Sequence, residues 1–170
     1  MSQLKVNSIV PTGGLSIGAS GGIIQIVSST KTDTNSSSST SFVDTGLTAS
    51  ITPSSTNNKI YIVSSIYWSH TGGPAMVLNL VRGTQNISQP SVTSGAHAGT
   101  VAAWVNERSL SSHTITFLDS PSFTQGDTLT YKIQWKSTNG QTIYLNQYAV
   151  NNTQYHGTST ITLFEVSGWV

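Results

Sequence analysis

The chain has 170 residues, of which only 8% are charged, and its formal net charge is +1. Nucleic acids and anionic lipids are bound through clustered Lys and Arg, so we expect neither as a partner. The sequence contains no cysteine, which excludes disulfides and thiolate metal sites. The length predicts one folded unit with its own core and a short extension.

The sequence predicts an extended N-terminal arm at residues 1–22 and a folded head at residues 23–170. The opening alternates weakly as far as Val10 and then meets Pro11 and a series of glycines. It has too few side chains to bury a face, so we expect it to pack against the head or another chain. Its candidate attachment residues are Leu4, Val6, Ile9 and Val10. No secretory signal or membrane-spanning stretch is recognisable, which predicts synthesis in the cytoplasm and no membrane insertion.

Residues 28–41 are mostly Ser and Thr. Such a composition predicts an exposed loop or a sheet edge, and the loop is the more ordinary interpretation. Alternating apolar residues then predict strands at residues 41–51, 59–68, 75–82, 101–105, 115–117 and 158–166. The strand at 59–68 carries apolar residues on both faces, which indicates burial on both sides, the second at a subunit contact.

The clearest strand lies within residues 127–136. Its large apolar side chains alternate with polar ones, and they are Leu129, Tyr131, Ile133 and Trp135. A second strand-like run at 142–145 follows Asn139 and Gly140, and Asn-Gly between two such runs predicts a β-hairpin. No helical period occurs anywhere in the sequence. Many short strands separated by turn clusters predict an all-β antiparallel sandwich, most like a jelly roll.

Two polar segments, residues 83–99 and 151–157, predict exposed loops, and long loops in compact domains are often functional. Flat rings in or near the second loop could stack on a sugar, although rings that merely cover the end of the sandwich are the more ordinary interpretation. Which loop binds is left open. The candidate surface-recognition residues are Gln89, His97, Tyr148, Asn152, Tyr155 and His156.

Catalysis would require acidic or metal-binding side chains to converge. Glu107, Asp119 and Glu165 could meet from separate strands, as glycoside hydrolysis requires of two carboxylates. No local motif supports this, and the four histidines are scattered without metal-ligand spacing. We therefore expect no enzyme activity, no metal and no cofactor.

Several segments resemble virion structural proteins of tailed phages. The opening LKVNSIVPTGGLSIGASGGIIQIV and the later SFVDTGLTASITPSSTNNKIYI, FLDSP, YKIQWKS and STITLFEV are similar to tail-fibre or tail-appendage proteins of marine and cyanobacterial phages. The resemblance implies that the arm joins other virion proteins or a fibre stem. It also implies a jelly-roll head, similar to TNF/C1q-like sandwiches, that forms a homotrimer on the outside of the particle.

Three functions remain open from the sequence. The head could attach to a host surface through a glycan or a protein, which is the function we expect. It could instead be a purely structural virion component, such as a collar, head decoration or tail connector, that binds no receptor. A polysaccharide-cleaving enzyme is the third, and it would depend on the carboxylates named above.

Overall fold

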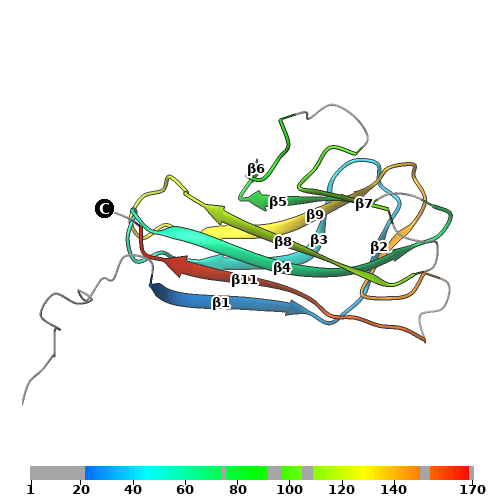
Figure 1. The fold of residues 1–170 in the computed structure, drawn as a ribbon, viewed down its shortest axis with the longest axis horizontal. Coiled ribbons are helices and arrows are strands. Elements are labelled where there is room, and N and C mark those ends of the chain that lie inside the picture. Colours follow the sequence, from blue (N-terminus) through cyan, green and yellow to red (C-terminus); the bar gives the residue numbers. More distant parts are fainter. Residues whose placement is uncertain (1–21, 74–75, 92–96, 105–108, 150–153, 169–170) are drawn as a thin grey trace, which may run out of the picture.

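The computed structural model describes residues 22–73, 76–91, 97–104, 109–149 and 154–168, and this part of the chain contains strands and no helix. The strands form two antiparallel sheets packed face to face, which confirms the predicted antiparallel β-sandwich (Figure 1). In chain order they are β1 (Ile23–Lys31), β2 (Asn35–Ser37), β3 (Val43–Ile51), β4 (Lys59–His70), β5 (Met76–Arg82), β6 (Gln85–Asn86), β7 (Val101–Ala103), β8 (Ser111–Asp119), β9 (Leu129–Ser137), β10 (Ile143–Leu145) and β11 (Ser159–Val166).

The first sheet, here sheet A, is built around β4. Along one side of β4, β11 pairs with its first part and β10 with its last three residues, while β8 pairs along the other side. β1 and β2 pair with β11 and β10 and form the edge beyond them. The start of β1 lies beside the end of β11 and the start of β4, and we call this end of the sandwich the base. The opposite end, where β1 finishes, is the tip (Figure 1).

The second sheet, sheet B, contains β3, β9 and β5 in that order. β6 and β7 both pair with the remaining side of β5. The period-two pattern predicted for β9 is confirmed, because Tyr131, Ile133 and Trp135 are fully buried between the sheets. Burying one large apolar side chain stabilises a fold by about 2 kcal/mol, so the rows of alternate residues hold the two sheets together. The other fully buried large residues include Ile60, Ile62, Ile66, Trp68, Met76, Leu78 and Leu80.

The predicted hairpin between residues 127–136 and 142–145 is wrong. β9 pairs with β3 and β5 in sheet B, whereas β10 pairs with β2 and β4 in sheet A. Asn139 and Gly140 do form a turn, and Gly140 has a φ of 79°, but the turn carries the chain from one sheet to the other. Both edges of β9 are already paired, with β3 and with β5, so β10 pairs in sheet A, where Ile143 and Leu145 are fully buried.

Half of residues 28–41, expected as a loop or a sheet edge, forms edge strand. β1 continues to Lys31, and β2 adds three more residues of this segment. Each pairs with an inner neighbour while hydroxyl side chains occupy its exposed positions, as when Ser28 Oγ lies 3.0 Å from Thr162 Oγ1. The polar composition therefore reflects an exposed sheet edge, the second of the two predicted possibilities.

The outer face of β5 is covered by the segment that follows β6. Val77 is fully buried there, although it points away from the core. Gly99 packs so closely on it that a Cβ at this position would lie 2.2 Å from Val77 Cγ1. Within residues 83–99, the described residues 87–89 and 98–99 are half-buried, whereas 83–86, 90, 91 and 97 are exposed as predicted, and only a residue without a side chain fits at Gly99.

Trp68 and His113 form a hydrogen bond on the inner side of sheet A, and it makes stability depend on pH. Trp68 Nε1 donates to His113 Nδ1 at 2.8 Å, which requires a neutral imidazole. Burial lowers the pKa of His113 below its ordinary value of 6.5. The unfolded chain therefore takes up the proton at a higher pH than the folded chain does. The contribution of the neutral His113 ring to the unfolding free energy is complete above the ordinary pKa and is lost as the pH falls below it.

We expect the wild type to lose about 1 kcal/mol more unfolding free energy than His113→Asn between about pH 7 and about pH 5. The amide of asparagine does not titrate, and its oxygen retains an acceptor near the indole. Urea unfolding followed by tryptophan fluorescence at several pH values measures the difference. Parallel pH profiles for the two proteins would contradict this assignment.

Candidate functional site

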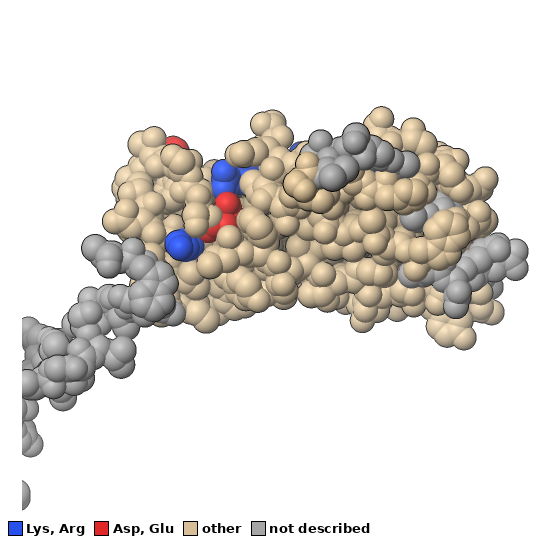
Figure 2. All heavy atoms as spheres, turned by 45° about the horizontal axis from the view of Figure 1, so that its top comes forward, with Lys and Arg blue, Asp and Glu red and all other residues tan. Residues whose placement is uncertain are grey.

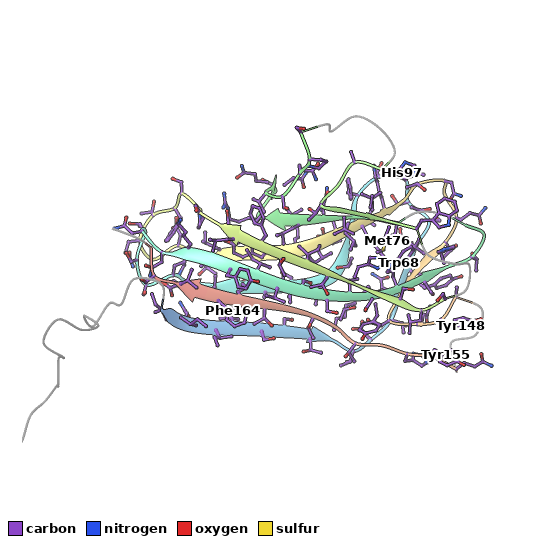
Figure 3. The ribbon with its side chains drawn as sticks, viewed as in Figure 1. Trp68, Met76, His97, Tyr148, Tyr155 and Phe164 are labelled. Carbon is purple, nitrogen blue, oxygen red and sulfur yellow. The ribbon has the colours of Figure 1, made fainter. Side chains whose placement is uncertain are left out.

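Three predicted recognition residues meet at the tip. The chain between β10 and β11 turns back on itself, with Tyr148 N donating to Tyr155 O at 3.0 Å and a β-bridge joining Gln147 to His156. The rings of Tyr148 and Tyr155 meet edge to face with their centroids 5.5 Å apart. Tyr155 is 61% exposed, and both tyrosines project at the end of the molecule (Figure 3). The tip therefore presents aromatic surface to solvent.

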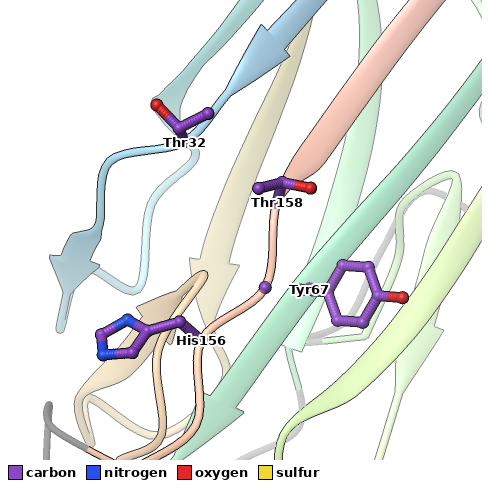
Figure 4. A pocket seen from close by; sticks show the side chains of 5 residues that line it. Thr32, Tyr67, His156 and Thr158 are labelled. Carbon is purple, nitrogen blue, oxygen red and sulfur yellow. The ribbon is translucent and has the colours of Figure 1, made fainter.

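A hollow of about 430 Å³, with His156 among its lining residues, opens at this end of the sandwich, and we call it the tip hollow. Three separate parts of the chain line it: the end of β1, the outward side of β4 and the segment before β11 (Figure 4). The lining residues are Thr32, Tyr67, His156, Gly157 and Thr158. None of these described side chains is a carboxylate, an ammonium or a guanidinium, and the lining residues carry hydroxyl groups, an imidazole and one phenol ring.

Asn146 fixes the walls of the tip hollow. It is fully buried and has a φ of 60°, the only positive value found for a residue other than glycine in the described chain. Its Nδ2 donates to Lys31 O at 2.8 Å and to Asp33 O at 3.0 Å, and its Oδ1 accepts from Ser159 Oγ at 2.7 Å. Its backbone N donates to Tyr67 O at 2.9 Å. One residue, through its side chain and its backbone N, thereby ties together the end of β1, the start of β11 and β4.

Gly157 lies directly against the ring of Tyr67. A Cβ at this position would fall 2.6 Å from Tyr67 Cγ, closer than real contacts allow. Gly157 N also donates to Asn146 O at 3.1 Å. The glycine is therefore required for close approach, and the tyrosine ring is held as part of the hollow.

The remaining recognition candidates lie elsewhere. Gln89 is half-buried, and its side chain donates to the Asn79 side chain over the outer face of sheet B. His97 is exposed above the same sheet, apart from the tyrosine pair (Figure 3). Asn152 lies outside the described residues, as do the arm residues Leu4, Val6, Ile9 and Val10.

Two of the carboxylates weighed for catalysis face the core at the base, and each is bound by its own partners. Asp119 pairs with Arg82 and accepts a hydrogen bond from Tyr131 Oη at 2.8 Å, which links β8 of sheet A to β5 and β9 of sheet B. Burial, reinforced by Asp119, raises the pKa of Tyr131 well above its ordinary value, so the phenol stays protonated and donates. This carboxylate therefore joins the two sheets. Glu107 lies outside the described residues.

Glu165 is fully buried and accepts four hydrogen bonds. They come from Asn58 Nδ2 at 2.5 Å, Gln25 Nε2 at 2.6 Å, and the backbone N and Oγ of Ser54 at 2.7 and 2.8 Å. Burial alone would favour the protonated acid, but these donors outweigh it and hold the pKa of Glu165 below its ordinary value. The ionised side chain fastens β11 to β1 and to the connection between β3 and β4.

The outer face of sheet A carries an apolar row near the base. Four side chains lie in register across β1, β11, β4 and β8, and they are Ile26, Phe164, Tyr61 and Leu118. Their exposed fractions include 57% for Ile26 and 50% for Leu118, and the rings of Tyr61 and Phe164 lie 6.0 Å apart. Burial of residues 59–68 on both faces was expected, but in the single chain Tyr61 on the outer face is 38% exposed.

The surface between these features has few charges. Figure 2 shows a few charged side chains, with Lys or Arg beside Asp or Glu toward one end, on a face that is otherwise uncharged. Within the described ranges, no three His, Cys, Asp or Glu side chains are close enough to hold a metal ion, and no helix is long and apolar enough to cross a membrane.

Neither a protein-family model nor a curated protein matches the sequence. The tip and the apolar row are therefore the features of the described chain that bear on function.

Proposed function

We propose that the chain is an external appendage protein of a phage particle whose sandwich head attaches to the host surface through its tip. The observation that carries this proposal is that the two ends of the head differ. Residue 22 enters the sandwich at the base, whereas Tyr148, Tyr155 and the tip hollow lie at the opposite end (Figures 1 and 3). An attachment protein needs this arrangement, because one end must join the particle while the other faces the cell.

The chemistry of the tip supports the same proposal. A tyrosine that only covered the end of the sandwich would be packed under neighbouring residues, but Tyr155 is 61% exposed. Aromatic rings beside polar groups are enriched at recognition surfaces because they provide contact area at a small entropic cost. In this proposal the arm, residues 1–22, joins other virion proteins.

The attachment test measures binding of the fluorescently labelled protein to a panel of marine bacterial and cyanobacterial cells. We expect binding to at least one strain, and Tyr155→Ala should weaken it about tenfold. Phe123→Ala, an aromatic deletion in the loop before β9, is the control and should bind like the wild type. If no strain is bound, or if both variants behave alike, attachment through the tip is refuted. Absence of binding by an assembled protein would favour a structural collar, decoration or connector.

We further propose that three copies assemble through the apolar row. Exposed apolar side chains in register on a sheet favour association, since burying them removes that area from water. Light scattering at micromolar concentration should give about three times the chain mass of 18.0 kDa. Leu118→Glu should shift the mass to that of a monomer by burying an unpaired charge. Thr84→Glu, on the exposed turn after β5, is the control and should leave assembly intact. A wild-type monomer would refute this proposal.

A further inference from the structure

The tip hollow has a lining that selects for a particular ligand chemistry. We infer that it binds a neutral saccharide unit of a host-surface polysaccharide, an inference that rests on the proposed attachment function. The side chains of its lining residues carry the hydroxyls of Thr32 and Thr158, the phenol of Tyr67 and the imidazole of His156. Hydroxyl groups both donate and accept hydrogen bonds, as do the hydroxyls of a sugar.

The charges around the hollow argue against an ionic ligand. The nearest charged side chains in sequence are Lys31 and Asp33, on either side of Thr32. They neutralise each other, with Lys31 Nζ 2.7 Å from Asp33 Oδ2. No described lining residue supplies a guanidinium or ammonium for a uronate, sulfate or phosphate, or a carboxylate for an amine. Since recognition of charged groups depends on such partners, a neutral ligand is favoured.

The size and form of the hollow fit part of a longer ligand. Its volume of about 430 Å³ lies within the range of roughly 300–1,000 Å³ found for small-ligand sites. It is open to solvent rather than enclosed, so a saccharide unit could occupy it while the rest of the polysaccharide continues outside. Tyr155, which precedes the lining residue His156 along the chain, offers an exposed aromatic ring at the same end of the molecule.

The walls are organised before any ligand arrives. Asn146 holds the end of β1 and the start of β11 through buried hydrogen bonds, and Tyr67 N donates to Ser159 Oγ at 3.0 Å. Gly157 is fixed against the Tyr67 ring. Fixed walls reduce the entropy lost on binding, which matters for a ligand whose individual hydrogen bonds with neutral groups are weak.

The test uses the purified full chain on an array of immobilised glycans that includes neutral, uronic, sialylated and sulfated members. We expect the strongest signals on neutral glycans. The double variant Thr32→Val and Thr158→Val removes two lining hydroxyls at nearly constant shape, and it should weaken the best signal at least about tenfold. Thr84→Val, on the exposed turn after β5 in the other sheet, is the matched control and should remain within about twofold of the wild type.

Three results would overturn the inference: no neutral glycan retained, a preference for anionic glycans, or full binding by the double variant. Failure here can be separated from failure of attachment by treating cells before the cell-binding assay. Periodate oxidises sugar diols, whereas protease removes surface proteins. Cell binding that survives periodate but not protease would show a protein receptor, which would overturn the saccharide while leaving attachment through the tip standing.

Discussion

Replacing Asn146 by alanine is expected to lower the unfolding free energy by about 3–5 kcal/mol. The change removes both donors to the carbonyls of Lys31 and Asp33 and the acceptor for Ser159 Oγ. Each buried polar group left without a partner costs about 1–3 kcal/mol. The φ of 60° adds strain, because alanine tolerates the left-handed region less well than asparagine. Urea unfolding monitored by tryptophan fluorescence measures the loss.

Two further variants separate the effect of the lost hydrogen bonds on stability from the effect of backbone strain. Asn146→Gly removes the same hydrogen bonds but accepts the positive φ, so it should be about 1 kcal/mol more stable than the alanine variant. Asn139→Ala loses an acceptor for Gln141 N in an exposed turn and should cost much less. An alanine variant at 146 within about 1 kcal/mol of the wild type would show that this residue does not organise the tip.

Replacing Glu165 by glutamine is expected to cost about 3 kcal/mol despite the nearly identical shape. All four groups around the carboxylate are donors, from Asn58, Gln25 and Ser54. An amide nitrogen would face one of them, and the stronger bonds made by an ionised acceptor would be lost. Asp44→Asn is the matched control: its carboxylate is 53% exposed beside Lys132, so the same change should have little effect.

The unfolding free energy of the wild type should depend on pH through the same carboxylate, that of Glu165. Because the fold holds the pKa of Glu165 below its ordinary value of 4.5, its contribution is complete above that value and is lost as the pH falls through the lower, folded pKa. Glu165→Gln should therefore lose less stability than the wild type over this acid range. Equal acid sensitivity of the two proteins would show that the buried carboxylate is not ionised in the fold.

Much of the architecture was predictable because burial in a sandwich alternates with the strand period. The inward row of β9 follows directly from its alternating side chains, whereas β5 is buried on both faces because Gly99 and its neighbours cover its outer side. Pairing was harder to predict, since Asn139 and Gly140 specify a turn but not the sheet that receives the next strand. The Ser and Thr residues of β1 and β2 similarly specify exposure but do not distinguish a loop from an edge.

The tip could be predicted only in part. Tyr148, Tyr155 and His156 were recognisable as rings in a polar segment, and the structure brings them to one end. Thr32 and Tyr67 carry no local signal, because only the topology places them beside Thr158. The geometry of Asn146 could not be predicted either, since the sequence does not distinguish a buried asparagine with a positive φ from an ordinary loop residue.

The apolar row and the tip hollow share one side of the molecule. Tyr61 and Tyr67 are both outward residues of β4, the first near the base and the second near the tip. Copies joined through the row would therefore display their hollows around a common axis. Several weak contacts made at once raise the local effective concentration of each, so avidity would hold a particle on a cell even where a single hollow releases its ligand quickly.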